Sequence, residues 1–322
     1  MTAESHGRAR RGARAGEPQD RRHRALSQVD FGNSFAALGS LAYAGARVSA
    51  HVCDVQTGAT LLTIDDRIVQ PVGAIGSLLL LIEVSARLSA GESGFTLLDR
   101  VRQSPGTGTD SARHSELPKA AKRLPSLWNQ LKVPALPVVD LAVLVGATGD
   151  AVATNALLRH VTLAAVRRRG ETLGLGHTAV LDLVRAVRGP DEAPHFAVSS
   201  AEELAKMLAG LYRGEIVDQP TSARVLRWLG TNRGATLVAA ALGPNVAREK
   251  PHDESFRWVS SLGLESGLRA EVGLMFTTTR AAAFAVIIEF DSDAVATQLT
   301  AVDACRIVGH DLLEYLAARG GP

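Results

Sequence analysis

The chain has 322 residues, 46% hydrophobic and 21% charged, an ordinary composition for a globular protein with one large or two smaller cores. Its net charge of +2 at pH 7 gives no electrostatic reason to expect a nucleic-acid partner. The two cysteines, Cys53 and Cys305, lie in separate apolar segments without a CxxC pair. They predict buried reduced thiols rather than the disulfide framework of a secreted protein.

The chain begins with a basic segment, residues 1–28, that we expect to be a solvated tail. Its first 25 residues hold seven arginines and almost no large apolar side chains. The apolar stretch 35–46 predicts the first packed helix rather than a signal peptide, because it lies deep in the chain and runs into a strand pattern. No apolar run is expected to reach the ~18 residues of a membrane span. We therefore predict a cytoplasmic protein without a membrane partner.

After the tail, segments with the alternating pattern of strands and segments with the spacing of helices follow one another along the chain. Alternating residues predict a hairpin of two strands at 47–55 and 60–65. From 74 to about 230, apolar residues recur at helical spacing in stretches that end at or near glycines. Segments with β-branched or aromatic residues predict strands at 236–242, 256–263, 268–278 and 282–290, followed by a helix at 294–318.

This order predicts an α+β fold, with an antiparallel sheet flanked by the N- and C-terminal helices and an inserted all-helical subdomain. We assign residues 29–320 to one domain after the tail. Its α/β part is 29–68 together with 235–320, and its helical subdomain is 69–234.

Several local stretches resemble one enzyme family. VSAHVCDVQTGATLL resembles its first hairpin, AVATNALL the helix after its second motif, and GLESGLRAEVGL the strand pair after its third. LGLGHTAVLD and SSAEELAKMLAGLYRGE resemble the approach to its Ω-loop and the helix that follows. The family is the class A serine β-lactamases with their penicillin-binding relatives, and the resemblance covers residues 30–318. It implies a β-lactamase/transpeptidase-like fold and hydrolysis through three motifs, S-x-x-K, S-D-N and K-T-G.

Each motif lacks its reactive residues in this chain. The chain reads Gly73-Ala74-Ile75-Gly76 for S-x-x-K, Gly149-Asp150-Ala151 for S-D-N, and Ser261-Leu262-Gly263 for K-T-G. A serine and a lysine one helical turn apart would activate the nucleophile, and neither is present. The resemblance assigns vestigial motif positions to Gly73, Gly76, Gly149, Asp150, Ala151, Ser261, Leu262 and Gly263. Asp150 is expected to cap or brace a helix start.

The missing lysine motifs do not depend on the alignment. The residues three positions before the five lysines are Glu116, Lys119, Asn129, Glu203 and Ala247, and no lysine is followed by Thr-Gly or Ser-Gly. The Ω-loop carboxylate of the family also lacks a counterpart. Val184 or a neighbour stands there, and Asp182, Asp191 and Glu192 align only after a shift of register.

Other chemistry has weaker support in the sequence. Ser77 has Leu80 at i+3, so it lacks an activating neighbour and predicts a helix-surface serine. The nine histidines, among them His51, His160 and His310, show no metal-binding spacing, so neither a metal nor a cofactor is predicted. Arg269 stands where many relatives hold the substrate carboxylate. We expect it either to bind a small anionic ligand or to be a solvated strand residue.

The leading functional prediction is a catalytically inactive family member that binds a small anionic ligand or a protein partner. In subtilisin, loss of the catalytic Ser or His costs about 2 × 10⁶ in kcat, and here several comparable groups are absent. One alternative is an active hydrolase of β-lactams, esters or peptides that uses other residues. Another is a structural or regulatory scaffold with the basic tail as its interaction arm.

Overall fold

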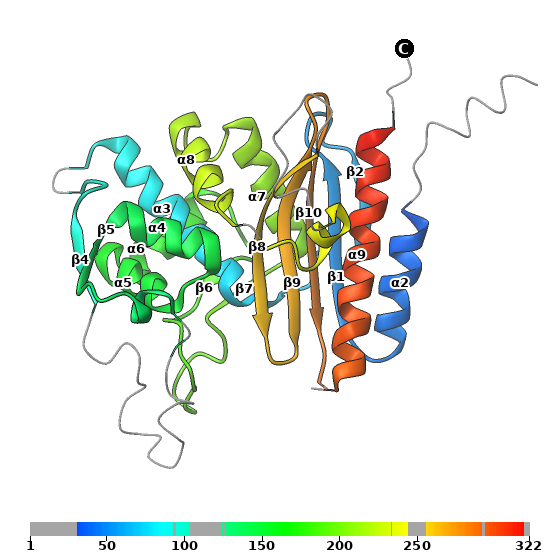
Figure 1. The fold of residues 1–322 in the computed structure, drawn as a ribbon, viewed down its shortest axis with the longest axis horizontal. Coiled ribbons are helices and arrows are strands. Elements are labelled where there is room, and N and C mark those ends of the chain that lie inside the picture. Colours follow the sequence, from blue (N-terminus) through cyan, green and yellow to red (C-terminus); the bar gives the residue numbers. More distant parts are fainter. Residues whose placement is uncertain are drawn as a thin grey trace, which may run out of the picture.

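The computed structural model describes residues 31–92, 95–103, 124, 126–232, 234–243, 256–291 and 294–318. Its largest sheet has five antiparallel strands in the order β2-β1-β10-β9-β8 (Figure 1). Their bounds are β1 Arg47–Asp54, β2 Thr60–Ile64, β8 Arg257–Glu265, β9 Leu268–Phe276 and β10 Ala281–Glu289. Strands from both ends of the chain therefore meet in one sheet, and the predicted α+β class is confirmed.

Helices cover both faces of this sheet. α2 (Gly32–Tyr43) and α9 (Val295–Ala317) lie on one face, and α7 (Ala201–Arg213) packs on the other (Figure 1). β10 is therefore buried on both sides: Phe284 and Val286 contact the α2–α9 core, and Ala285 and Ile287 contact the α7 core. This double burial explains why β10 reads as a continuous apolar run without alternation.

A buried carboxylate joins the two terminal helices. No side chain of the residue that precedes α2 caps its N-terminus. Instead Asp311 of α9, only 2% exposed, accepts hydrogen bonds from the Ser34 backbone N–H at 2.9 Å and from the Ser34 hydroxyl at 2.6 Å. The first turn of α2 thus finds its hydrogen-bond partner in a residue near the other end of the chain.

The middle of the chain folds into a block of helices beside the sheet (Figure 1). It contains α3 (Ser77–Ala90), α4 (Val138–Thr148), α5 (Ala151–Val161), α6 (Leu163–Thr172) and α8 (Gln219–Leu229), with 3₁₀ turns η1 (Gly73–Gly76) and η2 (Trp128–Gln130). α3 is the central helix of this block, and its residues from Ser77 to Ala86 are all buried. Glu83 on α3 is paired with Arg87 and Arg169, each at 2.8 Å, so its buried charge is compensated.

The expectation about apolar runs needs a correction. Gly73–Ala90 is a helical stretch of 18 residues with a mean hydropathy of 1.5, so it is long and apolar enough to cross a membrane. However, 72% of it is buried inside the fold, which is the environment of a core helix. η1 and α3 together reach this length, and the stretch is apolar because α3 packs against other helices on nearly every side.

Several predicted elements differ from the structure. Residues 236–242, predicted as a strand, include the 3₁₀ helix η3 (Val238–Leu242), which lies against α9. The approach is so close that a Cβ on Gly309 would lie 2.1 Å from the Val238 carbonyl oxygen. Residues 151–174 have the helical spacing of one continuous helix, but the helix is broken at Thr162, whose φ is +73° and whose hydroxyl caps α6.

Five short strands were absent from the sequence prediction. β3 (Gln70–Pro71), β7 (Ala197–Ser199) and β6 (Ala179–Val180) pair in that order, and β4 (Arg100–Arg102) pairs with β5 (Ala135–Pro137). With two or three residues each, these strands are too short to show a periodicity. The predicted basic tail, 1–28, and most of the polar loop 103–118 lie outside the described residues.

Candidate functional site

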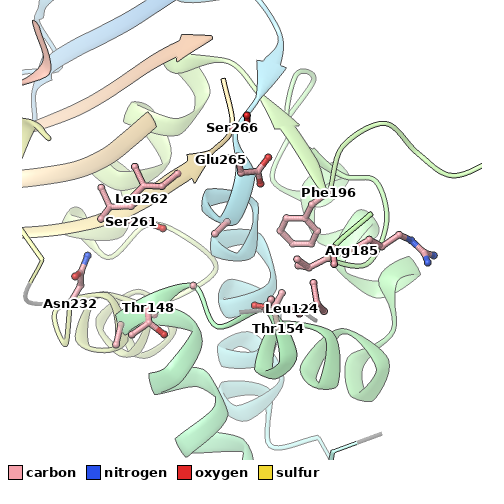
Figure 2. A pocket seen from close by; sticks show the side chains of 18 residues that line it. Leu124, Thr148, Thr154, Arg185, Phe196, Asn232, Ser261, Leu262, Glu265 and Ser266 are labelled. Atoms are coloured by element: carbon pink, nitrogen blue, oxygen red, sulfur yellow. The ribbon is translucent and has the colours of Figure 1, made fainter. Parts of the chain in front are cut away.

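A cavity of about 520 Å³ lies between β8 and the helical block, within the size range of ~300–1,000 Å³ that is typical of small-molecule sites (Figure 2). Its lining comes from η1 (Ala74), the α4–α5 corner (Gly146, Ala147, Thr148, Gly149, Ala151, Thr154), the segment before β7 (Val184, Arg185, Ala186, Phe196), the end of β8 (Ser261, Leu262, Leu264, Glu265, Ser266), and Leu124 and Asn232. Most of these side chains are apolar or small.

Ala74 and Gly149 lie directly opposite each other in this cavity. A Cβ on Gly149 would be 2.9 Å from the Ala74 Cβ, so η1 and the α4–α5 corner almost touch here. Gly149 also has a φ of +62°, where it ends α4 in the left-handed conformation that favours glycine. The structure therefore brings together the stretches that the resemblance aligned with the first and second motifs, with a methyl group and a hydrogen atom as the facing groups.

The positions predicted for the emptied catalytic pair need a correction of register. Neither Gly73 nor Gly76 lines the cavity. A Cβ on Gly76 would lie 2.1 Å from the Ala197 Cβ, because β7 fills the space beside it. Ala74 faces the cavity, and Ser77 follows it at the spacing of S-x-x-K. The geometry favours Ala74 in place of the serine and Ser77 in place of the lysine.

Ser77 was predicted to lie on a helix surface, and this is wrong. The residue is only 3% exposed, and its hydroxyl donates a 2.7 Å hydrogen bond to the Ala74 carbonyl oxygen. It does not line the cavity. A buried hydroxyl that bonds to the backbone of its own turn has no geometry for attack on a ligand.

Asp150 braces the α4–α5 corner as predicted. It caps α5, accepting from the Ala153 N–H at 2.9 Å, and it also accepts from the Ser126 hydroxyl at 2.9 Å and the Leu127 N–H at 2.6 Å. The side chain is 3% exposed and does not line the cavity. Its role is structural, since it holds the corner that carries Gly149 and Ala151.

The stretch that the resemblance aligned with the third motif forms the sheet wall of the cavity. Ser261 and Leu262 line it, whereas Gly263 does not. A Cβ on Gly263 would lie 2.4 Å from the Val72 carbonyl oxygen, so this glycine permits the close approach of β8 to the residue before η1. Asn232 supports the same wall from outside the sheet, donating a 3.2 Å hydrogen bond to the Ser260 carbonyl oxygen.

Val184 occupies the side of the cavity formed by the segment before β7. The buried Asn155 holds its backbone with two 2.8 Å hydrogen bonds, donating to the Val184 carbonyl and accepting from its N–H. This clamp fixes an apolar side chain in the cavity wall, at the place where the resemblance led us to expect the Ω-loop carboxylate.

The nearby carboxylates are engaged with arginines. Arg185 contacts Asp182 at 2.6 Å and Glu192 at 3.0 Å, and Arg188 contacts Asp182 at 3.1 Å. Burial alone would raise the pKa of Asp182, but hydrogen bonds from Arg185 and the Leu183 N–H, with the charges of both arginines, hold that pKa below its usual value. Asp182 is therefore a poor general base at neutral pH. Neither it nor Glu192 lines the cavity.

Arg269 does not line this cavity, and its contact with an anionic ligand stays a prediction. Its guanidinium donates to the carbonyl oxygens of Glu265 and Leu268 at 2.8 and 2.7 Å and to the Gln298 side chain at 2.6 Å. It also lies 5.8 Å from the Phe290 ring centre. These contacts show that Arg269 is not simply a solvated strand residue.

Three further lining hydroxyls, those of Thr148, Thr154 and Ser261, show no hydrogen bond to a base among the described residues. Thr148 and Thr154 donate to backbone carbonyls one turn earlier, at 2.9 and 2.8 Å. The side-chain hydroxyl of Ser261 makes no hydrogen bond to another described residue. Within the described ranges, no group of three or more His, Cys, Asp and Glu residues could hold a metal ion.

The cysteines and histidines lie elsewhere. Cys53 and Cys305 are buried and free, as predicted, and burial raises the pKa of both thiols, most strongly for Cys305. His51 is 3% exposed and its Nδ1 lies 2.7 Å from the Asp66 carboxylate, while His160 stacks on Phe95 with ring centres 5.2 Å apart. None of these residues lines the cavity.

Comparison with known proteins gives the family. The profile of the β-lactamase enzyme family matches residues 31–316. The chain belongs to this family. No curated protein sequence matches the chain.

Solved structures agree with this assignment at the level of the fold. A β-lactamase from Sphaerobacter thermophilus matches with a TM-score of 0.73 and 19% identity, covering 91% of this chain and all of its own. A class A β-lactamase from Mycobacterium abscessus matches with a TM-score of 0.67 and 17% identity, covering 87% and 99% of the two chains. PBP-A also matches, with a TM-score of 0.67 and 15% identity over 88% and 96%. The β-lactamase-like serine hydrolase fold is thereby established.

Sequence reasoning missed two residues that shape this β-lactamase-family cavity. Ala74 was not predicted as a motif residue, because Gly73 and Gly76 suggested lost side chains. The sequence nevertheless shows the three-residue spacing from Ala74 to Ser77. Asn155 was read only as part of the AVATN stretch, and its clamp on Val184 spans 29 residues. A long-range contact of this kind leaves no periodicity in the sequence.

Proposed function

We propose that this β-lactamase-family protein has lost serine hydrolase activity and uses the retained cavity to bind a small molecule. The observation that carries the proposal is the pair Ala74 and Gly149, which meet in the cavity without a hydroxyl or an amine between them. Acyl transfer in this fold requires an activated serine, and a methyl group supplies neither nucleophile nor proton acceptor. Val184 adds an apolar side chain to the same wall.

Retention of the cavity supports binding rather than a purely structural role. Asp150 and Asn155 are buried polar residues whose hydrogen bonds hold the cavity walls in place. A packed scaffold would gain stability by filling a space of about 520 Å³ with side chains. Open volume with apolar walls and a few polar groups is instead the ordinary architecture of a small-molecule site. Binding of a protein partner remains a second prediction, to be tested separately.

Ser261 supports one alternative function, an active hydrolase of β-lactams, esters or peptides. Its hydroxyl lines the cavity from β8 and makes no hydrogen bond within the described part of the chain, so a ligand carbonyl could reach it. The alternative requires a base for Ser261. No described lining residue is hydrogen-bonded to it in that role.

Hydrolysis assays on the full chain separate the two functions. We expect no turnover above the buffer rate with a chromogenic cephalosporin, a penicillin or a nitrophenyl ester, and no difference between the wild type and Ser261→Ala. Turnover that disappears in Ser261→Ala would establish the hydrolase and end the proposal. Turnover that persists in Ser261→Ala would also contradict it and would point to another nucleophile.

A further inference from the structure

The charge of the cavity lining bears on the chemical class of its ligand. Two lining residues carry a charge, Arg185 and Glu265. Arg185 is neutralised by Asp182 at 2.6 Å and Glu192 at 3.0 Å, and Figure 2 shows its guanidinium directed away from Ser261 and Leu262. Its positive charge is therefore directed to its own carboxylates and not to the cavity.

Glu265 has a different environment. Its side chain forms no ion pair or hydrogen bond with the described residues, and Figure 2 places it at the end of the cavity next to Phe196. Its Oε1 would lie 2.8 Å from a Cβ on Gly73, so the carboxylate covers the start of η1. The cation nearest along the chain, Arg269, bonds to the Glu265 carbonyl oxygen and extends to Gln298. The carboxylate of Glu265 is thus available to a ligand.

The rest of the described lining gives the shape of the ligand body. Phe196, Leu124, Val184, Leu262 and Leu264 supply apolar surface, and Leu264 is 51% exposed at the rim. An apolar body buried against these side chains would supply most of the binding free energy. The exposed rim leucine fits the same chemistry, because a bound apolar group would shield it from water.

On the basis of the proposed function, we infer that the cavity binds a primary amine with an aromatic or aliphatic body, whose ammonium group meets Glu265. The family's motifs supply cations that bind a substrate carboxylate. The described lining of this cavity would instead favour a cationic ligand. A carboxylate ligand would meet Glu265 as a like charge, and Arg185, the cation of the described lining, is already paired with Asp182 and Glu192.

Three small probes of similar size test this inference: phenethylamine, phenethyl alcohol and phenylacetate. Their dissociation constants for the full chain can be measured by ligand-observed NMR titration at low salt. We expect the amine to bind about two- to fivefold more tightly than the alcohol, because an exposed ion pair adds about that factor. The carboxylate should bind least tightly, and high salt should reduce the differences. Competition between amine and alcohol should show one shared site.

Two matched variants locate the effect. Glu265→Gln should remove the preference for the amine over the alcohol and leave the affinity for the alcohol unchanged. Glu171→Gln makes the same charge change at an exposed position on α6, outside the lining, and should leave all three affinities unchanged.

The outcomes separate this inference from the proposed function. Competing probes that favour the carboxylate, or an amine preference that survives Glu265→Gln, would overturn the inference about charge and leave the binding cavity intact. Absence of competitive binding by all three probes would overturn both, because no small-molecule site would then be present.

Discussion

At the scale of single residues, the structure distinguishes the groups that hold the cavity walls from the groups that face the cavity. Asp150 and Asn155 are buried and fully engaged with backbone N–H and carbonyl groups. Ala74, Gly149 and Val184 form the walls that these residues support. Loss of a buried hydrogen-bonding group costs stability, whereas loss of a reactive group that faces a cavity does not. The two kinds of residue can therefore change independently.

Glu271 on β9 makes a prediction about stability and pH. Burial raises the pKa of this carboxyl from 4.5 to about 7, although hydrogen bonds from the Ala239 and Val238 N–H groups lower it somewhat. Between pH 4.5 and about 7, the Glu271 carboxyl is therefore protonated in the folded state and ionised in the unfolded state. Since the folded pKa is the higher one, this residue makes the fold less stable as the pH rises from 4.5 to about 7, by about 3 kcal/mol in total.

The variant Glu271→Gln isolates this effect. Glutamine does not titrate, and its amide oxygen can still accept from the Val238 N–H, which now bonds to Oε2 at 2.6 Å. Urea unfolding at pH 5 and pH 8 should show that the variant gains about 3 kcal/mol relative to the wild type between the two conditions. Equal pH dependence in both proteins would mean that Glu271 is ionised in the fold at pH 5.

At the scale of elements, the packing of η1 against β7 decides which residue of the first motif faces the cavity. An alanine at position 76 would place its Cβ 2.1 Å from the Ala197 Cβ. We expect Gly76→Ala to destabilise the fold by about 1–3 kcal/mol, as overpacked core positions do. The free energy of unfolding from urea denaturation measures this.

Two further variants control that experiment. Ala197→Gly removes the clashing Cβ, so the double variant Gly76→Ala/Ala197→Gly should lose less stability than the sum of the single variants. Ala74→Ser adds one atom facing the cavity and should change stability by no more than about 0.5 kcal/mol. A Gly76→Ala variant as stable as the wild type, with Ala74→Ser destabilised, would favour the original register, in which Gly73 and Gly76 mark the catalytic pair.

The elements could be predicted where one periodicity persists for several residues. β1, β2, β8, β9, β10, α7, α8 and α9 all lie close to the ranges expected from the sequence. The segment of η3 was predicted as a strand because TLVAAAL is apolar throughout and shows no polar face at helical spacing. Its 3₁₀ conformation depends on contacts with Glu271 and α9, which are distant in the sequence. The break at Thr162 was missed because a non-glycine residue with a φ of +73° leaves no signal in composition.

At the scale of the whole molecule, the α+β class followed from the order of elements alone. Residues 29–68 and 235–320 were assigned to one α/β part, but the pairing of β1 with β10 was not predicted, because pairing between distant strands has no local signature. The stretches that align with the family's motifs could likewise be found in the sequence. Which of their side chains face one another could not, because that depends on contacts between distant parts of the chain. Ala74 rather than Gly73 or Gly76 faces Gly149 because β7, more than 100 residues later, occupies the other side of η1.

The intact mass of the full chain after incubation with benzylpenicillin tests the central claim most directly. A serine hydrolase of this fold forms a covalent acyl intermediate, which adds the mass of the opened lactam. The structure predicts an unchanged mass, because the cavity presents Ala74 and Gly149 where an attacking group would stand. A stoichiometric adduct on any residue lining the cavity would show that the site still carries a working nucleophile and would contradict the account.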